Sequence, residues 1–301
     1  MSSPVFQSAV LRRETYTNKE VCGPSFNTRV SFGAEVPLIV SSKFDGTARH
    51  FYNVNIELDR PVSWICPEDI LEGCLNTYDA EELIRRAPGI YLRESLSNIS
   101  GYNVSGAVMC SLILLHNNRV VAEPSSSNWS KPYHGKMIEL HTEKNLIKPK
   151  ACIVNNDIMS SGYVKKSMGG LPSYIEVSST DDYVSELTFA QDFIKGDEYR
   201  VHVVENSIFV HRLSKYGVDY RRDGLSSVDQ TSFPDELSLL LIKMTKKEGL
   251  RFSGIDVILN ENGFFVIEIN PMPGYHSYEI RANSGYPITQ ALYELLQKPN
   301  L

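Results

Sequence analysis

The sequence has few cysteines, and those it has lie far apart. Cys22, Cys66, Cys74, Cys110 and Cys152 form no close pair. An odd number without metal-ligand spacing argues against a disulfide framework and against a zinc cluster. A chain of 301 residues buries enough surface to fold without such cross-links. The cysteine pattern favours a reducing compartment, so we expect a cytoplasmic protein.

The sequence also lacks a long apolar run and an excess of positive charge. The longest run, residues 107–115, is far shorter than the roughly 20 residues of a membrane helix. The first four residues, Met-Ser-Ser-Pro, do not have the basic-then-apolar pattern of a secretion signal. Acidic residues outnumber basic ones by 36 to 30, for a net charge of −6. We therefore expect neither a membrane nor a nucleic-acid partner.

What is present is the composition of an ordinary globular protein, with 42% hydrophobic and 22% charged residues. The length predicts about two domains. Strand-like segments at 36–40 and 62–65 alternate with helix signals, which indicates an α/β unit. Residues 89–121 look rich in strand, and 124–130 resemble a linker. Further along we expect helices at 135–144, 234–248 and 288–297, strands at 150–155, 161–166 and 174–177, and hairpins at 199–213 and 253–270.

The second hairpin has the strongest chemical pattern. Its turn allows a two-residue loop, Asn262-Gly263, or a three-residue loop that starts at Glu261. The three-residue loop keeps one face apolar, whereas a one-residue slip would exchange the faces. It predicts a buried face of Ile255, Val257, Leu259, Phe265, Ile267 and Ile269, and an opposite face of Asp256, Ile258, Asn260, Phe264, Val266, Glu268 and Asn270.

Asp256 then lies opposite Glu268, with Asn270 beside them. Two neighbouring carboxylates repel each other unless a cation lies between them. Such hard oxygen ligands suit Mg²⁺, which binds proteins through one or two carboxylates plus substrate phosphates. The alternative is a solvated hairpin end with ordinary acidic residues.

The first hairpin adds arginines. A loop centred on Asn206 places Arg200 opposite Arg212, and opposed like charges destabilise a sheet unless an anion bridges them. Arginine forks match phosphate geometry, and Arg221 follows a little later. The alternative is a set of ordinary surface arginines.

A lysine pair, Lys165-Lys166, precedes a turn with Gly169 and Gly170. A lysine before such a turn can hold phosphate through its charge and through backbone N–H groups, although an ordinary loop has the same pattern. No P-loop pattern occurs in the chain. The histidines form no triad pattern, and we expect structural or solvated roles for His202, His211 and His276.

Together these segments resemble the ATP-grasp superfamily, and within it the branch of ribosomal-protein glutamate ligases and microviridin-type peptide macrocyclases. The resemblance implies an α/β (α+β) architecture with an N-terminal extension (1–35), a pre-ATP-grasp α/β domain (36–127), a lid subdomain (128–190) and a C-terminal antiparallel-sheet subdomain (191–301). It rests on residues 128–132, 164–170, 191–194, 198–204, 219–221, 254–258 and 268–274.

The resemblance also implies roles for single residues, with ATP and Mg²⁺ as the ligands and Mn²⁺ as an alternative metal. Lys131 and Lys166 would contact the phosphates, although one register error would exchange Lys166 with Lys165. Gly169 and Gly170 would belong to the loop over the phosphates. The adenine hinge would be Gln191, Asp192, Phe193 and Ile194, and Glu198 would face the ribose. The metal ligands would be Asp256, Glu268 and Asn270, and the catalytic arginines would be Arg200, Arg212 and Arg221.

The activity so implied is ATP-dependent carboxylate–amine ligation through an acyl phosphate, with release of ADP and phosphate. The expected partner is an amino acid or a peptide. The alternatives are a peptide macrocyclase that forms side-chain esters or amides, and an ATP-binding protein without ligase chemistry. The substrate carboxylate, the nucleophile and assembly into a homo-oligomer stay open.

Overall fold

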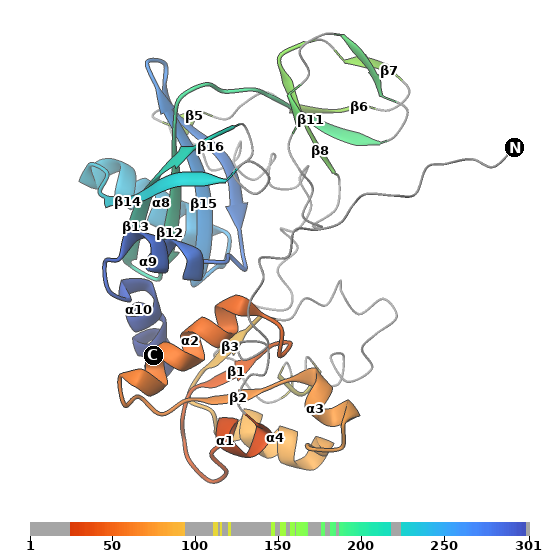
Figure 1. Ribbon diagram of the computed structural model, residues 1–301, viewed down its shortest axis with the longest axis vertical. Coiled ribbons are helices and arrows are strands. Elements are labelled where there is room, and N and C mark those ends of the chain that lie inside the picture. Colours follow the sequence, from red (N-terminus) through yellow and green to blue (C-terminus); the bar gives the residue numbers. More distant parts are fainter. Residues whose placement is uncertain are drawn as a thin grey trace, which may run out of the picture.

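The fold is that of a computed structural model, which describes residues 25–93, 111–113, 115, 120–121, 146–147, 151–154, 157–159, 161–167, 176–177, 181–184, 187–217 and 224–298. Within these ranges the strands form one sheet of six strands, two sheets of four and one pair (Figure 1). Helices accompany the six-stranded sheet and one of the four-stranded sheets. The mixed α/β class predicted from the sequence is confirmed.

The N-terminal sheet is parallel and covered on both faces. Its order is β2 (Ser63–Ile65), β1 (Leu38–Val40), β3 (Ile90–Leu92) and β4 (Val120–Val121), and its helices are α2 (Gly46–Glu57), α3 (Pro67–Leu71) and α4 (Thr77–Arg86). Helix α2 packs on one face and α4 on the other, which explains why every residue of β1, β2 and β3 is buried. Residues 111–113 and 115 are helical, so the strand-rich interpretation of 89–121 was wrong there.

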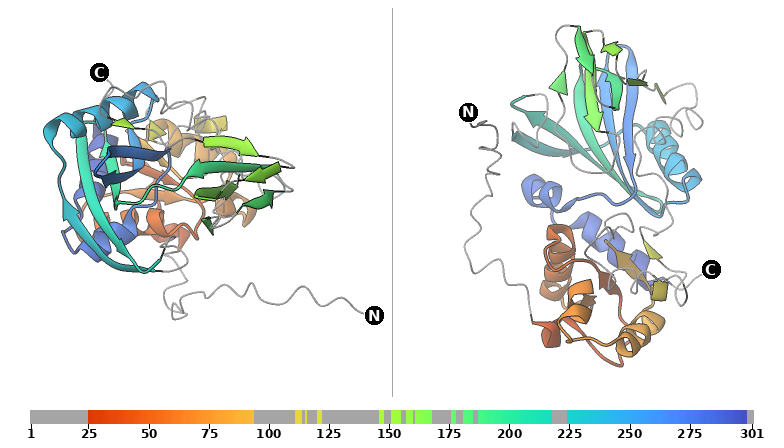
Figure 2. Two further views of the ribbon diagram at one scale, coloured as in Figure 1. Left: turned by 90° about the horizontal axis from the view of Figure 1, so that it is seen from above. Right: turned by 90° about the vertical axis from the view of Figure 1, so that its right-hand side faces the viewer.

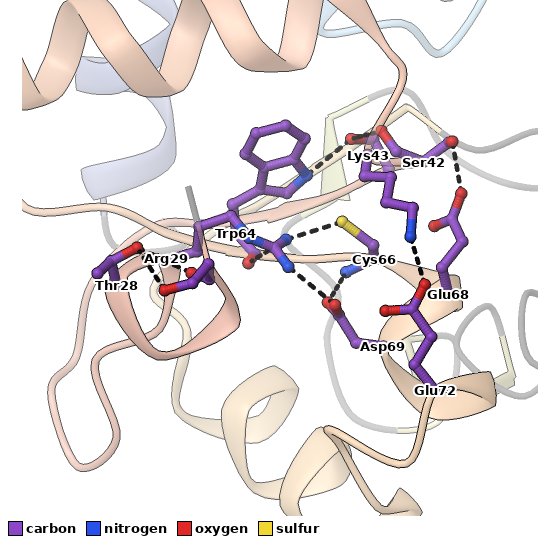
Figure 3. A network of polar contacts seen from close by, with 11 residues as sticks. Thr28, Arg29, Ser42, Lys43, Trp64, Cys66, Glu68, Asp69 and Glu72 are labelled. Carbon is purple, nitrogen blue, oxygen red and sulfur yellow. Dashed lines mark hydrogen bonds and ion pairs between the residues drawn. The ribbon is translucent and has the colours of Figure 1, made fainter. Parts of the chain in front are cut away.

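A short helix, α1 (Phe26–Arg29), is anchored to this sheet through Arg29 (Figure 3). The buried guanidinium donates to Asp69 Oδ1 and Cys66 Sγ, both at 2.8 Å, and to Trp64 O at 3.3 Å. Burial raises the pKa of the Cys66 thiol to about 12, so the thiol stays protonated beside this arginine. Residues 26–29, which we predicted to lie in an extension, thus pack against β2 and α3.

The middle of the chain forms small antiparallel sheets. The larger has the order β6 (Ala151–Val154), β11 (Thr188–Asp192), β8 (Tyr163–Ser167) and β9 (Glu176–Val177), and β7 (Asp157–Met159) pairs with β10 (Asp182–Val184). Strands β6, β8 and β9 confirm three predicted strands. The predicted linker at 124–130 and the predicted helix at 135–144 lie outside the described residues.

The six-stranded sheet has the order β14 (Leu225–Thr231), β13 (Ser207–Lys215), β12 (Asp197–Val204), β15 (Phe252–Asn260), β16 (Gly263–Asn270) and β5 (Leu146–Ile147). Helix α8 (Asp235–Lys247) packs Leu237, Leu241 and Met244 onto one face of it. Both predicted hairpins and the predicted helix between them are confirmed.

Two C-terminal helices, α9 (His276–Ala282) and α10 (Pro287–Gln297), lie between this sheet and the N-terminal sheet (Figures 1 and 2). Helix α10 approaches the loop before β3 so closely that a Cβ on Gly89 would lie 2.5 Å from Leu296 O. Of the helices in the described ranges, none is both long and apolar enough to cross a bilayer.

Candidate active site

The acidic hairpin brings Asp256 and Glu268 side by side, as predicted, but by a different route. Asp256 pairs with Glu268, and Gly254 pairs with Asn270. The register then shifts, so that Val257 pairs with Val266 and the turn closes with the two-residue loop Glu261-Asn262. The predicted three-residue loop was therefore wrong. Residue 267 is the additional residue of a β-bulge, and the bulge restores the predicted pairing at the acidic end.

Between the bulge and the turn, the residues of β16 lie on the opposite face from the one predicted. Phe264 and Val266, predicted on the polar face, pack in the core under α8 with Val257. On the other side of the bulge the register is the predicted one, so Asp256, Glu268 and Asn270 share the face opposite α8. All three are partly exposed, which leaves their oxygens accessible to a ligand.

Arg200 joins this acidic set from the neighbouring strand. It pairs with Asp256 in the register of β12 and β15, and its Nη1 donates to Asp256 Oδ1 at 2.7 Å. The arginine side chain is only 7% exposed, whereas that of Asp256 is 41% exposed. Gly254 provides the space, because a Cβ there would lie 2.6 Å from Arg200 Nη2. A fixed cation beside open carboxylates can stabilise negative charge on a reacting group.

Arg212 is not part of this set. The loop of the first hairpin is Glu205-Asn206, so Arg200 lies opposite His211 and Arg212 lies opposite Tyr199. The prediction that the two arginines face each other was wrong. Arg212 lies on the other face of the sheet, where its half-exposed guanidinium donates to Asp197 Oδ1 at 2.9 Å.

Glu198, predicted near the ribose, lies on the same face as Arg200 and forms an ion pair with Lys215. Sequence reasoning missed Lys215. Only the register of β12 and β13, which pairs Glu198 with Leu213, shows that Lys215 reaches this carboxylate.

Lys166 and Gln191 meet on β8 and β11, adjacent strands of the four-stranded antiparallel sheet. Lys166 is 7% exposed, and its Nζ donates to Gln191 Oε1 at 2.7 Å. Lys165 points to the other side of β8, as alternation along a strand requires. Residues 193–196 run from the end of β11 to the start of β12, so the predicted hinge connects this sheet to the six-stranded sheet. Lys166 thus lies on the same face as Gln191, and Lys165 lies on the opposite face.

Four predicted site residues lie outside the described residues. They are Lys131, Gly169, Gly170 and Arg221. Their roles stay predictions.

The donor set on the acidic hairpin fits a hard divalent cation. Asp256 and Glu268 offer carboxylate oxygens, and Asn270 offers Oδ1, which accepts one hydrogen bond, from Met272 N at 3.1 Å. A carbonyl oxygen keeps a second lone pair for a metal. No three His, Cys, Asp or Glu side chains gather into a metal cluster within the described ranges. A site of two carboxylates and an amide matches Mg²⁺ that takes its remaining ligands from phosphate and water.

Comparison with known proteins finds one matching family model and one curated relative. Residues 171–294 match the model of the RimK-like ATP-grasp domain. A probable alpha-L-glutamate ligase of Klebsiella pneumoniae (strain 342) is 33% identical over 116 residues, which are 36% of this chain and 34% of that protein. The match therefore spans about a third of the length of that curated relative.

Solved structures show the same fold. The ATP-grasp ligase PsnB complexed with a minimal precursor has a TM-score of 0.68 at 17% identity, over 87% of this chain and 98% of that one. The macrocyclase MdnC bound with precursor peptide MdnA, from Microcystis aeruginosa MRC, has a TM-score of 0.62 at 15% identity, over 87% and 99%. D-alanine–D-alanine ligase from Bacillus anthracis, complexed with ATP, has a TM-score of 0.56 at 12% identity, over 87% and 96%. The predicted resemblance is confirmed: the chain has the ATP-grasp fold, and its residues 171–294 match the RimK-like ATP-grasp domain.

Proposed function

We propose that the chain is an ATP-dependent carboxylate–amine ligase that works through an acyl phosphate. The observation that carries the proposal is the convergence of Arg200, Asp256, Glu268 and Asn270 on one face of three neighbouring strands. The similarity of residues in this chain to a probable glutamate ligase, and the ligases among the similar folds, support the same chemistry.

In this proposal Asp256, Glu268 and Asn270 hold Mg²⁺ or Mn²⁺, which neutralises phosphate charge when bound. Arg200 stabilises the negative charge on the transferring phosphoryl group. Lys166 and Gln191 bind the nucleotide from the four-stranded antiparallel sheet, together with the main chain of residues 192–194. Glu198, oriented by Lys215, accepts hydrogen bonds from the ribose.

The reaction has two steps. A substrate carboxylate attacks the γ-phosphorus of ATP, and the bond between this phosphorus and the β-phosphate oxygen breaks. The products are an acyl phosphate and ADP. An amine then attacks the acyl carbon, inorganic phosphate leaves, and the amine nitrogen loses a proton. The residues of the site act by positioning and by charge stabilisation, and exclusion of water protects the acyl phosphate from hydrolysis.

The division of labour along the chain is also a proposal. Residues 36–127 would shape the substrate site, residues 128–190 would cover the nucleotide, and residues 191–301 would hold the metal. An amino acid or a peptide would supply the carboxylate.

A peptide macrocyclase is the second candidate. It is favoured by the similarity of the fold to PsnB and MdnC, both of which have been solved with a precursor or precursor peptide. Mass spectrometry separates the two candidates, since a macrocyclase removes water from a single peptide and a ligase joins two molecules.

The test is ADP release with Mg·ATP and pooled amino acids and peptides, in the wild type and in Glu268→Gln. We expect substrate-dependent ADP release to fall by about 10²–10³-fold in the variant, because a neutral amide replaces a carboxylate of the phosphate-binding centre. The matched control is Glu261→Gln, which changes an exposed glutamate in the loop of the same hairpin and should leave the rate unchanged.

Undiminished turnover in Glu268→Gln would contradict the metal assignment. A wild type that binds Mg·ADP but releases no ADP with any pool would instead support an ATP-binding protein without ligase chemistry.

A further inference from the structure

The turn that follows Asn270 has an unusual shortage of backbone donors. Residues 271–274 read Pro-Met-Pro-Gly, and the two prolines have no N–H group. Side chains therefore hold much of this turn. Asn270 Oδ1 accepts from Met272 N at 3.1 Å, and His202 Nε2 lies 3.3 Å from Gly274 O. Both of these side chains come from the six-stranded sheet.

A third side chain reaches the turn from the N-terminal sheet. Arg93 directly follows β3, at the carboxyl edge of the parallel sheet, and its Nη1 donates to Pro273 O at 2.9 Å. The same guanidinium donates through Nε to Asp45 Oδ1 and Oδ2, at 3.1 and 3.0 Å, and through Nη1 to the Tyr91 hydroxyl at 3.3 Å. Arg93 thus connects the N-terminal sheet to the turn at Pro273, which lies 180 residues later in the sequence.

The surroundings of Arg93 make this contact rigid. The arginine side chain is 9% exposed, and Asp45 is itself fixed because its carboxylate caps helix α2 through Ala48 N at 2.7 Å. Burial alone would lower the pKa of Arg93, but the neighbouring Tyr91 and Asp45 raise it above the usual value. The charged guanidinium of Arg93, held in place by Asp45, therefore donates to the carbonyl of Pro273, three residues beyond Asn270.

The contact is more than general packing between the units. The apolar core formed by α2, α10 and the N-terminal sheet already joins them. Arg93 instead contacts the main chain of the segment that leads out of the metal-binding strand. On the other side, Pro273 packs against Gly254, where a Cβ would lie 2.5 Å from Pro273 Cβ. The turn is thus held between Arg93 and the strand that carries Asp256.

We propose that Arg93 is a positioning residue of the metal site. Its hydrogen bond to Pro273 O holds the 271–274 turn, and through the turn it holds Asn270 where the cation requires it. This inference rests on the proposed function, because it takes Asn270 as a metal ligand.

The test compares two variants that differ only at Arg93. Asp45→Asn removes the negative charge beside Arg93 but keeps a residue that caps helix α2 well. Arg93 itself is unchanged in this variant and retains its hydrogen bond to Pro273 O. The double variant Asp45→Asn/Arg93→Gln then removes that bond without leaving a buried, unpaired carboxylate. Calorimetry gives the Kd of Mg·ADP and of ADP in EDTA for both variants and for the wild type. Hydrogen exchange of residues 271–276 is followed without nucleotide.

We expect the double variant to bind Mg·ADP about tenfold more weakly than Asp45→Asn, as is typical when a group that orients a metal ligand is lost. Its affinity for ADP in EDTA should equal that of Asp45→Asn, and residues 271–276 should exchange faster. If Arg93 had a merely structural role, its loss would weaken the binding of Mg·ADP and of ADP in EDTA by the same factor.

Equal Mg·ADP affinity in the two variants would overturn the inference, and so would unchanged exchange in residues 271–276. If the wild type binds no Mg·ADP, the proposed function itself fails, and the inference fails with it. The two failures are therefore distinguished by the wild type.

Discussion

Among single residues, two histidines neighbour Arg200 in the sheet: His202 lies two residues further along β12, and His211 pairs with Arg200 on β13. Both rings are fully buried, with centroids 6.0 Å apart, and both pack against Tyr278. Burial lowers both pKa values, and for His202 the charge of Arg200 lowers the pKa further. Neither ring nitrogen of His211 has a hydrogen-bond partner among the described residues. Both imidazoles are therefore neutral at neutral pH, which agrees with the structural role expected from the sequence.

These lowered pKa values predict how stability depends on pH. In the unfolded chain a histidine binds a proton near about pH 6.5, but in the folded protein His211 binds it only at lower pH. The unfolded state then binds more protons, so the free energy of unfolding falls as the pH falls below about 6.5. His211→Phe keeps an aromatic ring beside Tyr278 and removes one such group. We expect the variant to lose less stability than the wild type between about pH 7 and pH 5.

Denaturant unfolding at several pH values measures this difference. Some pH dependence should persist in the variant, because burial also lowers the pKa of His276. An identical loss of stability in the two proteins would show that His211 does not contribute.

The types of residue in the site could be predicted, but some of their positions could not. Asp256 and Glu268 were placed correctly because the bulge at residue 267 offsets the one-residue error in the predicted loop. Arg212 was misplaced because one residue more or less in a turn moves a strand side chain to the other face. The turn Glu205-Asn206 has no glycine to indicate its length, and Glu205 adopts a φ of 54° that few residues adopt.

Among the helices, α9 and α10 depend on a contact that no periodic pattern indicates. Glu279 of α9 is buried, and its Oε1 accepts from Ile288 N at 2.7 Å and Thr289 N at 2.9 Å. Its Oε2 lies 2.7 Å from Thr289 Oγ1 and 2.8 Å from His50 Nε2. The carboxylate thus caps α10, where negative charge is favourable, and connects both helices to α2.

Glu279→Gln tests the importance of this cap. The amide keeps one acceptor but loses the charge and some of the hydrogen bonds, so we expect unfolding to cost about 1–3 kcal/mol less. Glu294→Gln, on the exposed side of α10, should change stability by no more than about 0.5 kcal/mol. Equal effects of the two substitutions in denaturant unfolding would refute the capping role.

The same helices show what limits prediction at this scale. Helix α8 was predictable because Pro234 precedes it and Gly249, with a φ of 71°, follows it. Helix α9 has only 7 residues, too few for a 3.6-residue period to stand out. The β-bulge at residue 267 was equally hidden, because no local residue type requires it.

For the whole molecule, the arrangement predicts that a nucleotide stabilises the fold more strongly with its metal than without it. In the proposed site the four-stranded antiparallel sheet supplies Lys166 and Gln191, and the six-stranded sheet supplies Asp256 and its neighbours, so one ligand would contact both. A ligand that binds only the folded state stabilises it by about 2.7 kcal/mol at a hundred times its Kd. We expect Mg·ATP to raise the melting temperature of the wild type, with a smaller rise for ATP in EDTA.

Asp256→Asn should abolish the part of this rise that depends on Mg²⁺. Because the amide partner leaves the charge of Arg200 less well compensated, the variant should melt lower even without ligand. The comparison is therefore the shift within each protein and not the absolute melting temperature. Asp229→Asn, an exposed aspartate on β14, is the matched control and should keep the full shift. If Mg²⁺ still adds to the rise in melting temperature in Asp256→Asn, the cation binds elsewhere, because this variant lacks the carboxylate that is proposed to hold it.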